Sequence, residues 1–282
     1  MKISIITPVY NSVSTIQKTI DSVVLEKEKH DIEYIVIDGG SNDGTLDVLK
    51  KNFVYIDKVI SEKDRGVHDA INKGIKISSG DYIFILAADD ILIKGGIDNF
   101  CDNLDEEADV WCGSIIVCDN NNNYYLDYSE ENLNNLFYHS SLRHPASFFK
   151  RDIFNKICYY DPDLKIAGDW MLFLTFFKNG AKFHIDTHPI VFFSKNGISS
   201  GKNFDLKERE SLKILKYAGA SQEYIENYIK SLNKDFRRSS SFFRKCTIFL
   251  LRRLYLYNIA KKIIYPNRVY LSKNDVINYG LK

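Results

Sequence analysis

Two adjacent carboxylates follow a short apolar run in the first half of the chain. Residues 82–86 read Tyr-Ile-Phe-Ile-Leu, which is typical of a buried strand, and Asp89 and Asp90 come after two alanines. Neighbouring anions repel each other and desolvate poorly unless a cation lies between them. Carboxylate oxygens at the carboxyl edge of an α/β sheet suit Mg²⁺ or Mn²⁺. The pattern predicts a divalent-metal site; the alternative is that Asp89 caps a helix starting near residue 94 or lies in a polar loop.

A further acid, Asp169, opens a second apolar run. Residues 169–178 read Asp-Trp-Met-Leu-Phe-Leu-Thr-Phe-Phe-Lys, which predicts a buried helix with Asp169 in its first turn. Taken alone, that position indicates an N-cap, because Asp is strongly favoured there.

Strands and helices alternate in the region that must position these acids. We expect strands at 3–6, where Thr7-Pro8 ends the first, at 33–38 and at 54–60, each followed by a polar turn and a helix. This alternation predicts a parallel sheet. The glycine-rich turn at 39–45 has the order Gly-Gly-x-x-x-Gly, so it is not the dinucleotide-binding fingerprint.

The second half of the chain alternates less regularly. Strands at 109–117 and 124–128 flank an asparagine-rich turn and predict a hairpin, and helices are expected at 205–218 and 221–232. Residues 194–204 have loop composition and suit a lid.

Charge is distributed unevenly. Residues 236–282 hold eleven Lys and Arg against one acid, Asp275, a net charge of +10; because the whole chain carries +1, residues 1–235 carry −9. An acidic body argues against a nucleic-acid binder, and the basic, apolar tail predicts contact with an anionic membrane surface. The alternative is a helical hairpin that packs on the body with its cations in solvent.

Composition also predicts the compartment. Five cysteines form no Cys-x-x-Cys pair, and an odd number does not suit a disulfide framework, so a reducing compartment is expected. The chain opens directly on a strand-like segment without a leader, and no run of eighteen apolar residues occurs. We therefore expect a cytoplasmic protein that is peripheral on the cytoplasmic face of the membrane.

Five ordered segments stand out along the chain: Ile5–Asn11, Val36–Thr45, Glu62–Gly74, Gly80–Asp90 and Gly168–Trp170. Together they resemble the family 2 glycosyltransferases of the GT-A fold. The resemblance extends over roughly residues 1–200, and two of its segments, Glu-Lys-Asp-Arg-Gly and His-Pro-Ala-Ser-Phe-Phe, most resemble enzymes of bacterial capsule, exopolysaccharide and lipopolysaccharide assembly. It implies an α/β fold with a Rossmann-like, mostly parallel central sheet flanked by helices, here with a C-terminal helical extension.

The expected division of the chain follows from this resemblance. Residues 1–98 form the nucleotide-sugar-binding half of the GT-A domain and residues 99–204 its acceptor-binding half. Residues 205–282 lie outside the resemblance; their basic and apolar residues predict a helical, basic region that associates with a membrane.

The resemblance also implies roles for single residues. Asp38 matches the acid that accepts a hydrogen bond from the base, typically from N3–H of uracil, which fits because a carboxylate accepts but does not donate. Asp89 and Asp90 match an Asp-x-Asp-type motif, the first touching ribose or sugar and the second the metal, and Asp169 matches the catalytic base. The implied nucleotide- and donor-binding residues are Pro8, Tyr10, Asn11, Asp38, Arg65, Asp69, Asn72 and Asp89.

Three positions depart from the pattern of the family. Gly39 stands where the second Asp of an Asp-Asp-Gly-Ser turn is expected, Ala87 replaces the leading acid of Asp-x-Asp, and Gly168 replaces the acid usual before the base. Because of these departures, the identity of the donor sugar and the exact metal contacts do not follow from the resemblance.

The implied reaction is transfer of a sugar, with inversion, from a nucleoside-diphosphate sugar, first of all a UDP-sugar. The implied acceptor is a hydroxyl of a glycan or of a polyprenyl-diphosphate-linked saccharide, and the cofactor is Mn²⁺ or Mg²⁺. One alternative, a sugar-nucleotide nucleotidyltransferase, is disfavoured because Thr7–Asn11 carries no phosphate-binding cation. The other, a non-catalytic nucleotide-sugar-binding protein, is disfavoured because the metal pair and the candidate base are both present.

Overall fold

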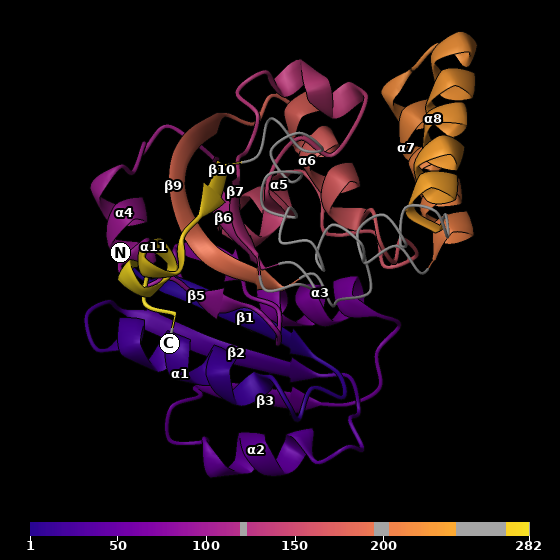
Figure 1. Ribbon diagram of the computed structural model, residues 1–282. Helices are drawn as coiled ribbons and strands as arrows, with labels where there is room; N and C mark the ends of the chain where they lie inside the picture. Colours follow the sequence, from indigo (N-terminus) through magenta and orange to yellow (C-terminus); the bar gives the residue numbers. More distant parts are fainter. Residues whose placement is uncertain (119–122, 195–202, 241–268, 282) are drawn as a thin grey trace, which may run out of the picture.

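A mixed sheet with helices on both faces forms the centre of the molecule (Figure 1). The computed structural model describes residues 1–118, 123–194, 203–240 and 269–281. The sheet order is β10-β7-β6-β8-β4-β1-β2-β3, with β9 paired to β5 and β6. The strands are β1 Ile3–Val9, β2 Ile32–Asp38, β3 Lys58–Ser61, β4 Tyr82–Ile85, β5 Ile91–Leu92, β6 Val110–Cys118, β7 Tyr124–Asp127, β8 Ser147–Lys150, β9 Phe183–Ser194 and β10 Val269–Leu271. The helices are α1 Ile16–Lys27, α2 Thr45–Lys51, α3 Val67–Ile77, α4 Gly96–Asp102, α5 Ile153–Lys156, α6 Gly168–Lys178, α7 Phe204–Ala218, α8 Gln222–Ser240 and α11 Lys273–Asn278, with short 3-10 turns η1 Leu133–Phe137 and η2 His144–Ala146.

The first half of the chain forms the parallel part of the sheet, as predicted. Strand β1 pairs in parallel with β2 and with β4, and β2 pairs in parallel with β3. Side chains alternate between two apolar clusters, so that Ile3 and Ile5 pack on one face of the sheet and Ile6 on the other. Both faces are covered by helices, which explains why these strands read as continuous apolar runs.

Two strand boundaries differ from the prediction. Strand β1 continues through Thr7-Pro8 to Val9, because β2 still pairs with it there. Its pairing with β4 ends at Ile6, so Pro8 lies beyond the β4 ladder and its missing N–H is tolerated. Strand β3 begins only at Lys58. The preceding apolar residues 53–55 lie exposed in the connection after α2.

The antiparallel part of the sheet comes from the second half of the chain. Strands β6 and β7 form the predicted hairpin, and β8 joins β6 to β4. Strand β9 runs parallel to β6 along its whole length. The sequence did not predict β10, which pairs antiparallel with β7 near the end of the chain.

The helices of the second half agree with the pattern in the sequence. Helix α6 is the predicted buried helix, and α7 and α8 are the two helices expected after it. Ile214 and Leu215 of α7 are fully buried in the same apolar cluster as Phe173 of α6. Most of the predicted lid and of the basic tail lies outside the described residues. Among the helices that the structure describes, none is both long enough and apolar enough to span a bilayer.

Candidate functional site

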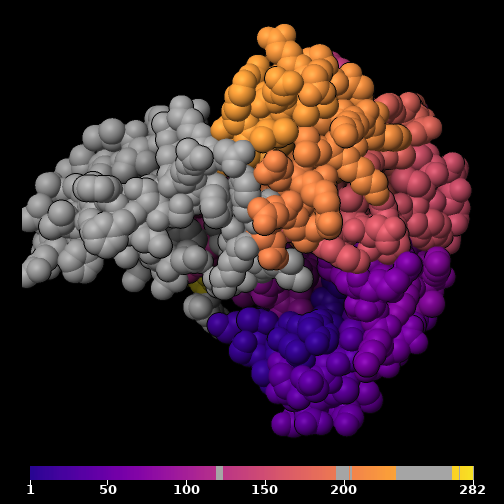
Figure 2. All heavy atoms as spheres, turned by 90° about the vertical axis from the view of Figure 1, so that its right-hand side faces the viewer, coloured from indigo at the N-terminus to yellow at the C-terminus, as the bar shows by residue number. Residues whose placement is uncertain are grey.

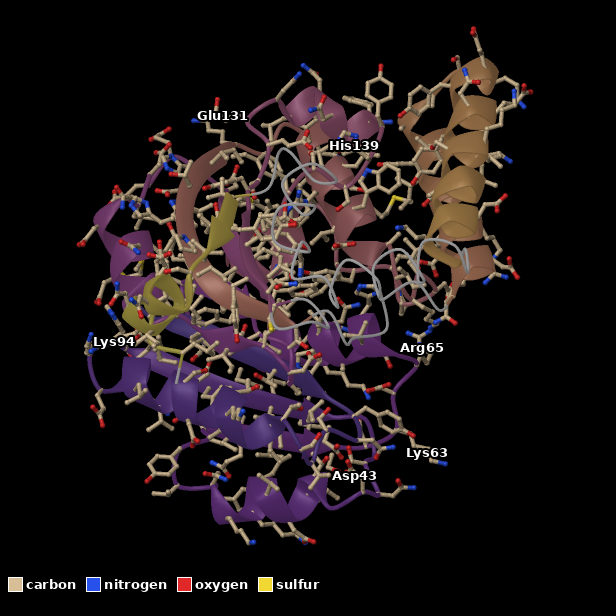
Figure 3. The ribbon with its side chains drawn as sticks, in the orientation of Figure 1. Asp43, Lys63, Arg65, Lys94, Glu131 and His139 are labelled. Atoms are coloured by element: carbon tan, nitrogen blue, oxygen red, sulfur yellow. The ribbon has the colours of Figure 1, made fainter. Side chains whose placement is uncertain are left out.

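The predicted site lies at the edge of the sheet where the parallel strands end. The loops after β2 and β3 carry Asp43, Lys63 and Arg65, which lie together on the right-hand side in Figure 3, whereas Lys94 lies on the opposite side. Figure 2 looks onto this edge and shows the surface hollowed between the indigo N-terminal residues and the orange α7. Ligands bind at this edge in open α/β sheets.

Asp90 is a buried carboxylate with one unsatisfied oxygen. Its side chain is 1% exposed, and Oδ1 accepts a hydrogen bond of 3.0 Å from the backbone N–H of Ser194 at the end of β9. Oδ2 has no hydrogen-bond partner among the described residues. Burial and the neighbouring charge of Asp89 raise the pKa of Asp90 well above its ordinary value. The site therefore favours either a proton or a bound cation at Asp90.

Asp89 lies beside Asp90 in the same turn and is partly exposed. Burial raises the pKa of Asp89 as well. The alternative role, capping the next helix, is not the one observed, because the N-cap of α4 is Gly95. The donor set of two adjacent carboxylates, one with a buried and unpaired oxygen, fits a divalent cation.

Asp38 ends β2 and holds the turn that follows it. The side chain is fully buried. Oδ2 accepts hydrogen bonds from Ser61 Oγ at 2.7 Å and from the N–H groups of Gly40 and Ser41 at 3.1 Å, and Oδ1 accepts from Ser41 N–H at 3.2 Å. The carboxylate thus ties the glycine-rich turn to β3. Its predicted bond to a base is not visible in this arrangement and stays a prediction.

The turn after β1 joins the same region. Asn11 has a left-handed φ of 49°, donates its backbone N–H to Ser41 Oγ at 2.8 Å, and accepts a bond of 3.0 Å from Asn42 N–H on its side-chain oxygen. Tyr10 is 62% exposed, and Pro8 is buried within β1. The structure therefore links two of the predicted donor segments through Asn11 and leaves the ring of Tyr10 open.

The third donor segment begins α3. Arg65 is largely exposed, and its guanidinium and backbone N–H both bond to the carboxylate of Asp69. Burial would raise the pKa of Asp69, but these bonds and the charge of Arg65 outweigh it and hold the pKa below its ordinary value. Asn72 is buried, and its amide bonds both the carbonyl and the N–H of Tyr160. Asn72 therefore ties α3 to the segment before α6.

Asp169 lies in the first turn of α6, where it is partly exposed. It is not the N-cap, which is Ala167; its Oδ1 accepts a bond of 2.8 Å from Trp170 N–H. His144 is partly buried, with Nε2 2.6 Å from the hydroxyl of Tyr160. Burial lowers the pKa of His144 to about 4, although the nearby charge of Asp169 acts in the opposite direction. His144 is thus neutral near pH 7.

Glu210 of α7 is a positioning residue that the sequence did not reveal. It is 3% exposed, and its carboxylate accepts hydrogen bonds from the backbone N–H groups of Lys165, Ile166 and Ala167 at 2.7 to 2.9 Å. These groups precede α6 directly, so Glu210 satisfies donors next to the helix that carries Asp169. One acid among several in an amphipathic helix gives no signal of such a role.

A second group of potential metal ligands lies elsewhere. Oxygen and nitrogen atoms of Glu26, His30 and Asp98 lie within 4.8 Å of one another in the part of the chain that the structure describes. His30 Nε2 is 2.8 Å from Asp98 Oδ1. This group connects the end of α1 with α4 and does not include the predicted metal pair.

The sequence and the fold of this chain were also compared with those of known proteins. Residues 4–166 match the profile described as glycosyl transferase family 2. The chain belongs to this family. A PGL/p-HBAD biosynthesis glycosyltransferase of Mycobacterium bovis is 27% identical to this family 2 member over 195 residues, which cover 67% of this chain and 74% of the relative.

Two solved structures resemble this family 2 chain in fold. S. aureus TarS 1-349 in complex with UDP-GlcNAc has a TM-score of 0.60 at 18% identity, and the match covers 86% of this chain and 74% of the TarS chain. The mannosyltransferase PcManGT from Pyrobaculum calidifontis, in complex with GDP-Man and Mn²⁺, has a TM-score of 0.56 at 15% identity. The match covers 94% of this chain and 87% of PcManGT. These likenesses confirm the predicted GT-A fold. Family membership supports the transferase over the nucleotidyltransferase alternative.

Proposed function

We propose that this chain transfers a sugar from a UDP-sugar to a hydroxyl group of a glycan or lipid-linked saccharide, with inversion at the anomeric carbon. The observation that carries the proposal is Asp90, a buried carboxylate with an unpaired oxygen, beside Asp89 at the ligand-binding edge of a GT-A sheet. The M. bovis relative is named a PGL/p-HBAD biosynthesis glycosyltransferase, and TarS was solved with UDP-GlcNAc. These relatives support the substrate class.

The donor binds, in this proposal, over the loops that follow β1, β2 and β3. The exposed ring of Tyr10 offers a stacking surface for a base, and Asn11 holds the loop beneath it. The guanidinium of Arg65, held by Asp69, offers its remaining N–H groups to a diphosphate. Asp38 and Asn72 act through the backbone that they hold, Pro8 lies buried within β1 below these loops, and Asp89 faces the ribose or sugar.

Asp90, assisted by Asp89, would hold Mn²⁺ or Mg²⁺, which supplies positive charge to the leaving diphosphate. PcManGT, which shares the fold, was solved with Mn²⁺ and a nucleotide sugar. Around this site, Ser194 N–H fixes one oxygen of Asp90 and leaves the other for the cation. Arg65 adds a second positive charge where negative charge develops.

Asp169 is the proposed general base. Its Oδ1 accepts the N–H of Trp170, and this bond fixes the carboxylate at the start of α6. In this role Asp169 takes the proton of the acceptor hydroxyl as the acceptor oxygen attacks the anomeric carbon from the side opposite the leaving group. One displacement inverts that centre, so no second carboxylate is needed as a nucleophile.

The test is a screen of UDP-, dTDP- and GDP-sugars for binding and hydrolysis, with and without Mn²⁺. We expect Asp90→Ala to lose metal-dependent binding and Asp169→Asn to bind one donor normally but turn it over at least about a hundredfold more slowly, since general-base catalysis contributes about 10²–10⁴-fold. An exposed acid far from this edge, Asp31, provides the control Asp31→Asn. Failure of every nucleotide sugar to bind under any metal condition would overturn the proposal.

We also propose a place of action. The acceptor is a glycan or polyprenyl-diphosphate-linked saccharide of bacterial surface-polysaccharide synthesis, and the enzyme meets it at the cytoplasmic face of the inner membrane. The support is the net charge of +10 on residues 236–282, which suits an anionic surface.

A further inference from the structure

We propose that Asp64, in the loop between β3 and α3, is the residue that reads the donor's base. Asp64 selects bases that donate a ring N–H, such as uracil, thymine and guanine, over cytosine and adenine. The inference rests on the proposed function, and it assigns to Asp64 the contact that the family resemblance implied for Asp38.

Asp38 is closed to a ligand in this structure. It is fully buried, and its two oxygens accept hydrogen bonds from Ser61 Oγ and from the N–H groups of Gly40 and Ser41. Three donors hold this carboxylate: Ser61 Oγ, Gly40 N–H and Ser41 N–H all bond Oδ2, and Ser41 N–H is shared with Oδ1 at 3.2 Å. Oδ1 keeps a lone pair, but the side chain is fully buried, so a base does not reach it. Asp38 shapes the turn, and another acceptor must meet a base above that turn.

Asp64 lies directly over that turn. A Cβ atom built on Gly39 would lie 2.5 Å from Asp64 Oδ2 and 3.1 Å from its Cγ. The carboxylate of Asp64 therefore occupies the space into which a side chain at position 39 would extend. Gly39 N–H bonds to the carbonyl of Val9 at 2.9 Å, which places this point at the end of β1, next to Tyr10.

One carboxylate oxygen of Asp64 is fixed by a hydrogen bond, and the other is free to accept one from a ligand. Oδ1 accepts a hydrogen bond of 2.8 Å from Gly66 N–H, which sets the orientation of the side chain. Oδ2 accepts no hydrogen bond from any residue that the structure describes, and the side chain is partly exposed. Tyr10, 62% exposed, follows Val9 on the adjacent strand end. A stacking ring and an open acceptor thus border the same strand end.

The chemistry of a carboxylate sets the choice of base. An ionised carboxylate only accepts hydrogen bonds, so it pairs with N3–H of uracil and meets the lone pair at N3 of cytosine unfavourably. An asparagine at this position has both a donor and an acceptor, and its NH₂ group can bond N3 of cytosine. The variant Asp64→Asn therefore distinguishes recognition of the base by hydrogen bonding from a non-specific effect of the carboxylate charge on nucleotide binding.

The experiment compares the binding of UDP and CDP to the full chain by calorimetry in the presence of Mn²⁺. Wild type is expected to prefer UDP by about tenfold or more, the scale of a charge-assisted hydrogen bond. In Asp64→Asn the UDP-to-CDP ratio falls to about one or below. Glu62→Gln removes the same charge from an exposed residue of the same loop and leaves the ratio unchanged.

A second variant moves the carboxylate back to the turn. Gly39→Asp alone is expected to lose UDP affinity, because its Cβ collides with Asp64. The double variant Gly39→Asp with Asp64→Gly removes that collision and restores the preference for UDP.

A wild-type preference for UDP that Asp64→Asn leaves unchanged would overturn the assignment while leaving the proposed function standing. If wild type bound neither nucleotide, the proposed function itself would fall.

Discussion

Glu33, near the start of β2, shows how one residue can set the acid stability of the protein. Its carboxylate is 5% exposed and accepts hydrogen bonds from Ser4 Oγ, Lys58 Nζ and both the N–H and Oγ of Ser79, at 2.6 to 2.9 Å. Burial alone would raise the pKa of Glu33, but the four donors outweigh it and lower the pKa from 4.5 to about 2. The folded state therefore prefers the ionised form more strongly than the unfolded state does.

This depression of the pKa makes a prediction for Glu33→Gln. Stability from a lowered carboxyl pKa is fully present above the unfolded value of 4.5 and is lost as the pH falls through the folded value of about 2. We expect the variant to lose about 2 to 3 kcal/mol of unfolding free energy at pH 7. The difference from wild type should shrink below pH 4.5, as measured by urea unfolding at several pH values. The exposed Glu28→Gln is the control, and an equal loss at pH 7 and pH 3 would contradict this account.

Two glycines explain which parts of the site the sequence could and could not predict. The acids Asp89, Asp90 and Asp169 lie where the motifs indicated, because each follows a strand or begins a helix that apolar periodicity reveals. Gly39 and Gly168 looked like losses of acids. In the structure Asp64 covers Gly39, and the ring of His68 lies 2.3 Å from a Cβ built on Gly168. In both cases a side chain distant in sequence occupies the space beside the glycine, so no local sequence pattern reveals the contact.

At the scale of elements, α7 packs into the core with α6 although it follows the predicted lid. Ile214 and Leu215 pack into the cluster that contains α6, and Glu210 bonds three consecutive N–H groups before α6. A buried carboxylate that accepts three N–H groups cannot be replaced by an amide without placing an NH₂ group against a donor. The position of Asp169 therefore depends on Glu210.

Glu210→Gln is the corresponding prediction. We expect a loss of about 1.5 to 3 kcal/mol of unfolding free energy, the range for hydrogen bonds to a charged group. Turnover should fall because α6 and Asp169 shift, while the affinity for the donor nucleotide, bound by the other half, stays within about twofold. Urea unfolding, calorimetry with UDP and a hydrolysis assay measure the three quantities. The exposed Glu223→Gln on α8 serves as the control, and a loss of nucleotide affinity as large as the loss of turnover would show that Glu210 does not act through Asp169.

The strands illustrate why some elements were predictable and others were not. Strands β1, β2 and β4 are buried on both faces, so their apolar runs identify them. Strand β10 has only three residues in a basic region, and its partner β7 lies far upstream in the chain. Its existence depends on a tertiary pairing that leaves no periodic signal. The continuation of β1 through Pro8 was not predicted for the same reason, because it depends on pairing with β2.

At the scale of the whole molecule, the end of the basic tail is part of the fold. Strand β10 pairs with β7, and Val276 of α11 is 4% exposed in a cluster with Ile93 and Phe192. Ser272 and Asp275 form a capping box at the start of α11. Deleting residues 236–282 would therefore remove a strand and part of the core together with the charges. Substitution of charges in the full chain is the cleaner test of a membrane role.

The proposed membrane contact predicts the effect of removing four cations from the tail. Arg252, Arg253, Lys261 and Lys262 are changed together to Ser, and binding to vesicles containing phosphatidylglycerol is measured by sedimentation at low salt. Each basic residue near an anionic surface contributes about 1 kcal/mol, so the change should weaken binding by up to roughly a thousandfold. Vesicles of phosphatidylcholine alone should bind wild type and variant equally weakly.

The matched control removes the same charge from the body by changing the exposed Lys18, Lys50, Lys51 and Lys63 to Ser. The acidic body, with its net charge of −9, is repelled by an anionic surface, so these four residues should contribute little to vesicle binding. Equal weakening by both sets would mean that total charge decides binding and that the tail has no special part in it. Unchanged binding in the tail variant would exclude an electrostatic role for these four residues, and the polyprenyl-linked acceptor would then have to be reached by another surface.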